Sequence, residues 1–250
     1  METASHENST VRIGILYPGY AAEDDFELLN RRLEGTAAFE VVHTSIGEDA
    51  HREAALIDMG SSERLLEGAR RLSAGVSAVI WACTSGSFIY GWEGAQRQTA
   101  EIEDALGLPV SSTSLAYVNA LRALGLGRVS VAATYPEDIA RRFEAFLADA
   151  GVKSVSVASH GIVTAAEVGT LVRDDTLALV SAAHHVAAEA VLVPDTALHT
   201  IASLEALEEV AGKPVLTANQ VSAWEGMRLA GAPKTEPGLG QLFAAPASRP

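Results

Sequence analysis

Residues 77–88 read SAVIWACTSGSF and join a continuous apolar run to a cluster of small hydroxyl and glycine residues. A short apolar run that ends at turn residues indicates a strand buried on both faces, as the strands of a parallel sheet are. The only cysteine of the chain, Cys83, follows this run directly. We therefore expect Cys83 at the carboxyl end of a parallel strand, where open α/β sheets place their ligand sites.

The same alternation of apolar runs and amphipathic segments extends along the whole chain. Further strands are expected at residues 11–19, 39–47, 128–138, 153–161, 189–200 and 213–220, with a short one opening at Pro109. Helices are expected at residues 20–35, 61–74, 91–107, 137–151, 164–187, 203–212 and 221–232, and after the short strand within residues 108–127. Strands that alternate with helices at this spacing predict an α/β fold with parallel sheets built from βα units.

The two halves of the chain repeat one another. Three motifs correspond in order, namely Tyr17-Pro18 with Tyr135-Pro136, Cys83-Thr84-Ser85 with Asp195-Thr196-Ala197, and Pro109-Val110 with Pro214-Val215. The repeat predicts two pseudo-symmetric lobes, each a short parallel sheet flanked by helices, with Cys83 and Asp195 facing one cleft. We expect an N-terminal lobe at residues 11–115 and a C-terminal lobe at residues 116–232, with a disordered tail at 1–10 and a second tail at 233–250. The last helix of the C-terminal lobe is a candidate to cross back to the N-terminal lobe.

Composition and charge limit the classes of function. The net charge of −14 at pH 7 argues against nucleic acid and anionic membranes as partners, because both bind basic surfaces. The N-terminus is polar and lacks the apolar segment of a signal peptide, and no apolar run reaches the roughly 18 residues of a membrane helix. One cysteine excludes an intrachain disulfide. We expect a soluble cytoplasmic protein, and the sequence leaves homo-oligomerisation open.

Cys83 has two interpretations. Neighbouring hydroxyls and the backbone N–H groups of the turn that follows would stabilise a thiolate and lower the thiol pKa towards neutrality. The same donors would hold a substrate carboxylate. Alternatively, Cys83 is buried and inert, since free cysteine is among the residue types most often buried.

Asp195 also has two interpretations. A carboxylate directly after the apolar strand residues VLVP is poorly placed for solvation and could act as a general acid or base with a raised pKa. Alternatively, Asp195 or Thr196 begins a helical turn as its N-cap.

Other polar residues at strand ends are weaker candidates for substrate binding. Tyr135 could donate its hydroxyl to a carboxylate, Tyr17 and Pro18 occupy the matching place in the first half, and His160 ends a strand. Packing roles for the tyrosines and a surface position for His160 are the alternatives. The acidic run at residues 23–25 is expected to be a solvated helix start.

Several motifs are absent from the sequence. The histidines have no cysteine or carboxylate at ligand spacing, so no metal site is expected. There is no GxGxxG after the first strand, no GxxxxGK[ST] and no GxSxG, which disfavours nucleotide binding and serine hydrolysis.

Four segments carry a resemblance to a known family: VRIGILYP at 11–18, ACTSGSF at 82–88, PVSSTSLAYVNALRALGLGRVSVAATYPEDI at 109–139 and PVLTANQVSAWEGMRLAGA at 214–232. They resemble the aspartate/glutamate racemase superfamily, and most closely its branch of maleate cis-trans isomerase and arylmalonate decarboxylase. The segments GWEGA at 91–95 and PDTALHT at 194–200 are more similar to the ectoine-utilisation members of this branch.

The resemblance implies two α/β lobes with the active site between them, no cofactor and no metal. In the racemases two cysteines face each other across the substrate. In maleate isomerase the first-half cysteine is the nucleophile, whereas arylmalonate decarboxylase has glycine there and protonates from the second-half cysteine. Cys83 matches the first-half position, and Thr84, Ser85 and Tyr135 match residues that hold a substrate carboxylate. Asp195 stands in place of the second cysteine, which excludes a two-thiol racemase.

These observations predict a cofactor-independent isomerase or racemase of a small carboxylic acid, acting by maleate-type cis-trans isomerisation or by racemisation or epimerisation at the α-carbon. Cys83 would be the nucleophile or base and Asp195 the opposing acid or base. Tyr17, Pro18, Thr196 and His160 complete the expected substrate-binding set. The alternatives are an arylmalonate-type decarboxylase, which the missing second thiol opposes, and a catalytically silent carboxylate-binding protein of ectoine catabolism.

Overall fold

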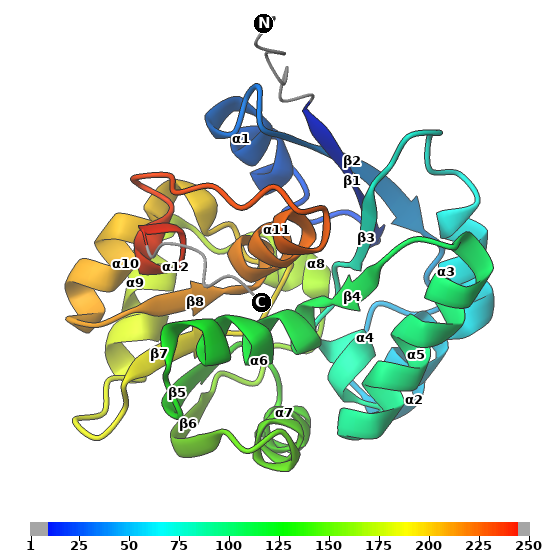
Figure 1. The fold of residues 1–250 in the computed structure, drawn as a ribbon. Coiled ribbons are helices and arrows are strands. Elements are labelled where there is room, and N and C mark those ends of the chain that lie inside the picture. Colours follow the sequence, from blue (N-terminus) through cyan, green and yellow to red (C-terminus); the bar gives the residue numbers. More distant parts are fainter. Residues whose placement is uncertain (1–9, 245–250) are drawn as a thin grey trace, which may run out of the picture.

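The computed structural model describes residues 10–244 and contains two parallel sheets of four strands each (Figure 1). The N-terminal sheet has the order β2-β1-β3-β4, from Ala37–Thr44, Val11–Pro18, Ala78–Trp81 and Val110–Ser112. The C-terminal sheet has the order β6-β5-β7-β8, from Lys153–Ser159, Arg128–Ala133, Ala190–Val193 and Val215–Thr217. Each half therefore repeats one topology, and the predicted α/β fold with two similar lobes is confirmed.

The inner strands explain why the apolar runs of the sequence are continuous. Every residue of β3 and of β7 is buried. A parallel strand covered by helices on both faces has no solvent side, so its residues need not alternate between polar and apolar.

Helices flank both sheets. They are α1 (Asp25–Arg32), α2 (Glu53–Met59), α3 (Ser62–Ala69), α4 (Ser85–Phe88), α5 (Gly91–Leu106), α6 (Thr113–Leu124), α7 (Glu137–Asp149), α8 (Ala165–Val168), α9 (Arg173–Ala182), α10 (Leu204–Ala211), α11 (Ala218–Leu229) and α12 (Gly240–Ala244), with a 3₁₀ turn at Ile201–Ser203.

Two expectations about helices and tails differ from the structure. The single helix predicted at residues 164–187 is two helices, α8 and α9, because the backbone is extended at Val172, between them. The predicted tail at 233–250 includes α12, whose Leu242 and Phe243 are buried in the main core. The predicted tail at 1–10, apart from Thr10, and residues 245–250 lie outside the described residues.

Two helices connect the halves. Helix α6 follows β4 of the N-terminal sheet, yet the hydroxyl of Tyr117 in α6 donates to the carbonyl oxygen of Val193 in β7 over 2.5 Å. Helix α11 follows β8 of the C-terminal sheet and packs against β3 and β4 of the other sheet. The two helices lie against each other, and the hydroxyls of Thr113 and Ser222 are 2.7 Å apart. The expected division at 115/116 falls inside α6.

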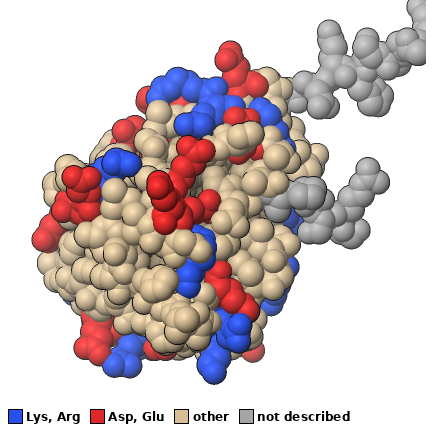
Figure 2. Space-filling view, turned by 90° about the vertical axis from the view of Figure 1, so that its left-hand side faces the viewer, with Lys and Arg blue, Asp and Glu red and all other residues tan. Residues whose placement is uncertain are grey.

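The surface carries charges of both signs. Figure 2 shows the face at the left of Figure 1, where small groups of acidic and basic side chains are interspersed among uncharged residues. Within residues 10–244, no helix combines the length and apolar character that crossing a bilayer requires.

Candidate active site

Cys83 lies two residues beyond the end of β3 and two residues before the start of α4. Its side chain is buried, and the backbone N–H of Gly86 donates to Sγ over 3.2 Å. A Cβ atom at residue 86 would lie 3.0 Å from that sulfur, so glycine permits the close approach of the α4 backbone.

Burial controls the protonation of this sulfur. Desolvation is the main cause that raises the pKa of Cys83 to about 12; the charge of Asp195 adds to the rise, and the contacts with Gly86 and Ser85 oppose it only in part. In the unliganded cavity this favours the thiol, in line with the buried cysteine that was one of the two interpretations of the sequence.

Asp195 lies two residues beyond the end of β7 and is also buried. One carboxylate oxygen accepts the backbone N–H of Ala197 over 3.0 Å, and the other accepts the hydroxyl of Thr134 at the end of β5. Both oxygens are thus engaged in holding the loop that follows β7 to the neighbouring strand end.

Cys83 and Asp195 line the same cavity of about 170 Å³. Ser85 lies on the wall with Cys83, Thr196 lies on the wall with Asp195, and the end of β1 contributes Tyr17 and Pro18. The cavity is therefore built from both halves, at the carboxyl ends of their strands, as expected for this class of sheet.

Thr84, Tyr135 and His160 do not line this cavity. The Tyr135 hydroxyl donates to the carbonyl oxygen of Pro194, and burial followed by the charge of Asp195 raises the Tyr135 pKa well above its usual value. Thr84 Oγ1 is buried and has no hydrogen-bond partner among the described residues. His160 is exposed, and its Nδ1 lies 3.0 Å from the carbonyl oxygen of Ala133.

Asp49 and His51 also line the cavity, and the sequence did not indicate either of them. The Asp49 carboxylate accepts the N–H groups of Ala165 and Ala166 at the start of α8 over 2.8 and 3.0 Å. The His51 N–H donates to the carbonyl oxygen of Val163 over 2.7 Å. These bonds join segments more than a hundred residues apart, so no local pattern in the sequence could have revealed them.

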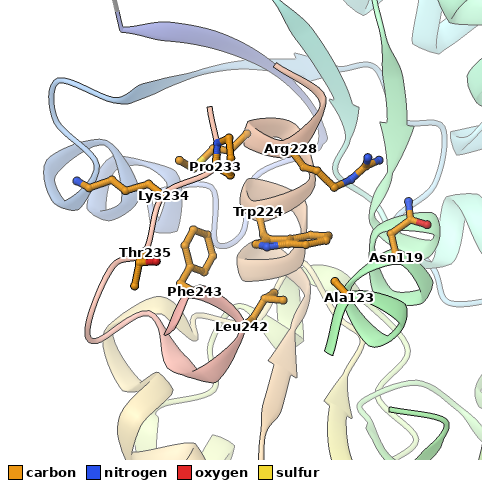
Figure 3. Close-up of a pocket in the computed structure, with 10 residues that line it drawn as sticks. Asn119, Ala123, Trp224, Arg228, Pro233, Lys234, Thr235, Leu242 and Phe243 are labelled. Carbon is orange, nitrogen blue, oxygen red and sulfur yellow. The ribbon is translucent and has the colours of Figure 1, made fainter. Parts of the chain in front are cut away.

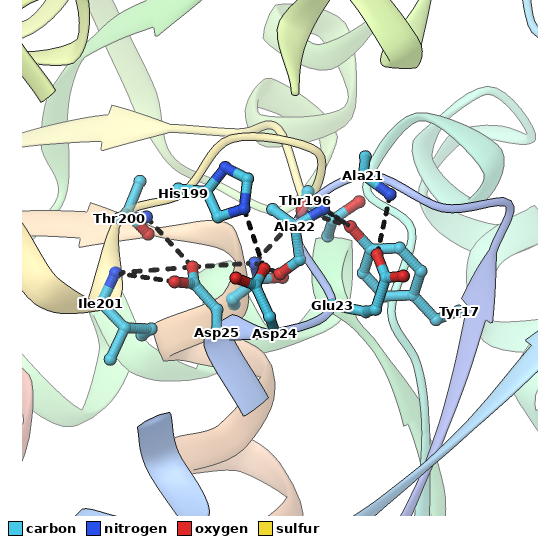
Figure 4. A network of polar contacts seen from close by, with 11 residues as sticks. Tyr17, Ala21, Ala22, Glu23, Asp24, Asp25, Thr196, His199, Thr200 and Ile201 are labelled. Atoms are coloured by element: carbon cyan, nitrogen blue, oxygen red, sulfur yellow. Dashed lines mark hydrogen bonds and ion pairs between the residues drawn. The ribbon is translucent and has the colours of Figure 1, made fainter. Parts of the chain in front are cut away.

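The Tyr17 side chain belongs to a polar network beside the cavity (Figure 4). Its hydroxyl donates to the carbonyl oxygen of Thr196 over 2.8 Å and accepts the N–H of Ala22 over 3.0 Å. Asp25, expected to be solvated, is instead buried and accepts the N–H of Thr200 over 3.0 Å. Burial raises the pKa of Asp25. The network fixes the loop after Asp195 to the start of α1 in the other half.

A second cavity, of about 240 Å³, lies between α6, α11 and the segment that leads into α12 (Figure 3). Trp224, Arg228, Lys234 and Phe243 are among its lining residues, and none of the predicted site residues is. Within residues 10–244, no group of three or more His, Cys, Asp or Glu side chains is arranged to hold a metal ion.

Comparison with known proteins gives a consistent result. The model of the arylmalonate decarboxylase family matches residues 59–243. Arylmalonate decarboxylase from Bordetella bronchiseptica is 34% identical over 188 residues, which cover 72% of this chain and 77% of that protein.

Solved structures agree with this match. A variant of arylmalonate decarboxylase in its liganded form has a TM-score of 0.83 and 29% identity, covering 94% of this chain and 99% of that chain. Maleate cis-trans isomerase from Nocardia farcinica, with a covalently bound succinylcysteine intermediate, has a TM-score of 0.84 and 22% identity, covering 94% and 98%. At 22% identity, the similarity to maleate cis-trans isomerase shows the fold alone. The extent of the family match and the 34% identity show that the chain belongs to the arylmalonate decarboxylase family.

Proposed function

We propose that this protein releases CO2 from a small malonate-type dicarboxylic acid and that the Cys83 thiol supplies the proton that replaces it. The observation that carries the proposal is a buried cysteine, with its pKa raised to about 12, on the wall of a cavity between the two halves. A protonated thiol is suited to donating a proton and poorly suited to nucleophilic attack. The relative with 34% identity is a decarboxylase, which supports the same reaction class.

The proposed reaction consumes one proton. The bond between the α-carbon and one carboxylate breaks, and its electron pair stays on the α-carbon and the second carboxylate as an enediolate. Cys83 Sγ–H transfers its proton to the α-carbon, and water returns a proton to the thiolate. The products are CO2 and a monocarboxylic acid.

The cavity offers different surroundings to the two carboxylates. Ile46, Leu56 and Met59 form an apolar part of its wall. A carboxylate there loses hydration, and its departure as neutral CO2 removes that cost. We place the departing carboxylate on this side.

The retained carboxylate would lie against Ser85 at the start of α4. The N–H groups of Gly86, Ser87 and Phe88 in α4 already donate to Cys83 Sγ and to the carbonyl oxygen of Thr84, and Thr84 does not line the cavity. The donor offered to this carboxylate is therefore the hydroxyl of Ser85. A preorganised donor of this kind typically lowers the barrier by about 3 kcal/mol, because it is already aimed at the charge that develops.

Asp195 takes a different role from the opposing acid or base expected from the sequence. Its two oxygens already accept bonds from Ala197 and Thr134, and its charge raises the pKa of Cys83. Asp195 would therefore keep the Cys83 thiol protonated and hold the loop that follows β7. The proton that reaches the substrate would come from Cys83 alone.

Cis-trans isomerisation is the second candidate. The resemblance of Cys83 to the nucleophile of maleate isomerase favours it, and its chemistry needs a thiolate. The raised pKa of Cys83 opposes that chemistry in the unliganded cavity.

The test is an assay of CO2 release from methylmalonate, phenylmalonate and aminomalonate, beside conversion of maleate to fumarate. Wild-type protein should release CO2 from at least one malonate, and Cys83→Ala should lose roughly a thousandfold in rate, within the range for a general acid. Equal melting temperatures for the two proteins would show that the loss is chemical. Unchanged CO2 release by Cys83→Ala, or isomerisation of maleate without CO2 release from any malonate, would overturn the proposal.

A further inference from the structure

The cavity between the halves carries negative charge and no cation. Its acidic lining residues are Asp49 and Asp195, and neither Lys nor Arg is among the lining residues. A malonate would bring two further negative charges into this space. Charge balance therefore favours a substrate that also carries a positive group.

His51 adds an acceptor to the same cavity. A carbonyl oxygen can only accept, so the 2.9 Å contact between His51 Nδ1 and the oxygen of Ile162 places a hydrogen on Nδ1. In the neutral ring Nε2 then presents a lone pair. Among the described residues, no protein group forms a hydrogen bond with this nitrogen.

The position of His51 is fixed by three contacts. Besides the bond to Ile162, its backbone N–H is bonded to Val163, and its ring packs edge to face with Tyr135 at 4.9 Å between centroids. His51 is only 8% exposed and lines the cavity, so Nε2 is positioned to accept a hydrogen bond from a ligand bound there.

We infer that the substrate carries an ammonium group on its α-carbon, which donates to His51 Nε2 and lies in the field of Asp49 and Asp195. This inference rests on the proposed decarboxylation and names its substrate class as a 2-aminomalonate. The volume of about 170 Å³ suits so small a molecule, since pockets for drug-sized ligands are typically about 300–1,000 Å³.

The test compares aminomalonate with methylmalonate, because ammonium and methyl groups have similar size and differ in charge and hydrogen bonding. Aminomalonate should have a kcat/KM at least about tenfold higher, the ratio expected from one charged hydrogen bond. It should also raise the melting temperature more than methylmalonate at equal concentration. Equal or better use of methylmalonate would overturn the inference.

The two measurements separate this inference from the decarboxylation itself. Absence of CO2 release from both acids and from phenylmalonate would overturn the proposed function, and the order of the two melting temperatures would still decide the inference. If no CO2 is released, stronger stabilisation by methylmalonate than by aminomalonate would overturn the inference that the substrate carries an ammonium group.

A pair of histidine variants isolates Nε2. In His51→Asn the side-chain NH2 can still donate to the carbonyl oxygen of Ile162. Asparagine is shorter and has no acceptor at the position of Nε2. The ratio of kcat/KM for aminomalonate over methylmalonate should fall about tenfold, and a general loss of folding would not move that ratio. His160→Asn is the matched control, because His160 makes the same kind of Nδ1 contact outside the cavity. An unchanged ratio in His51→Asn would contradict the assignment.

Discussion

The side-chain amide of Asn219 donates a 3.1 Å hydrogen bond to the buried carboxylate of Asp25, although 194 residues separate them in the chain. The same amide donates over 3.1 Å to the carbonyl oxygen of Thr196, which lines the active-site cavity. Asn219 lies in α11 and Asp25 at the start of α1, so one polar side chain connects both halves to the wall of the cavity.

Removal of the Asp25 carboxylate should destabilise the protein. Asp25→Ala leaves the N–H groups of Thr200 and Ile201 buried without acceptors, and each such group costs about 1–3 kcal/mol. We expect a loss of at least about 2 kcal/mol in the free energy of unfolding, measured by urea denaturation. The neighbouring Asp24→Ala is the control, because that side chain is exposed and its ion pair with His199 should contribute less than about 1 kcal/mol. Equal losses in the two variants would contradict this account.

Much of the fold could be predicted from the sequence because inner strands are buried on both faces. Strands β3 and β7 appear in the sequence as uninterrupted apolar runs, and the order of motifs around Cys83 and Asp195 indicates the repeat. Helices α2 and α4 were missed, since segments of 7 and 4 residues are too short to show a helical period.

The site could be predicted only where its residues lie at strand ends. Cys83, Asp195 and Tyr17 were found in that way, and all three line the cavity. His51 lies in an irregular segment, and its partner Ile162 is 111 residues away, so no spacing rule applies to it. The thiol pKa depends on burial by the whole fold, which sequence position alone does not give. The resemblance of residues 91–95 and 194–200 to ectoine-utilisation proteins stays a prediction.

Gly226 in α11 determines how closely this helix approaches the other sheet. A Cβ atom there would lie 2.6 Å from Cγ2 of Ile13 in β1. Gly226→Ala should therefore lower the free energy of unfolding by about 1–3 kcal/mol through overpacking. Gly127→Ala is the matched control, since no atom lies within 4 Å of the added Cβ and the residue is not in the left-handed region. A stable Gly226→Ala variant would show that α11 can shift away from the sheet.

Cys83 should remain a thiol well above the pH at which free thiols ionise. Burial raises its pKa to about 12 in the folded protein, above the ordinary value of about 8.5, so the stability it contributes is complete below about pH 8.5 and is lost as the pH rises towards 12. The ultraviolet absorbance of the thiolate, taken as wild type minus Cys83→Ser, should be absent in the folded protein near pH 9. In urea the same difference should show an ordinary thiol pKa of about 8.5. A folded protein that titrates like the unfolded one would contradict the proton-donor role.

Asp195→Asn separates the two roles considered for this carboxylate. Asparagine can still accept the N–H of Ala197 but carries no charge, so the Cys83 thiolate should form at lower pH than in wild type. Asp49→Asn is the control within the same cavity and should shift the Cys83 titration less. Release of CO2 from methylmalonate, which has no ammonium group to bind Asp195, should stay within about tenfold of wild type, because the proton comes from the thiol. A loss of roughly a hundredfold or more, as removal of a general acid or base causes, would instead restore Asp195 as the opposing proton carrier.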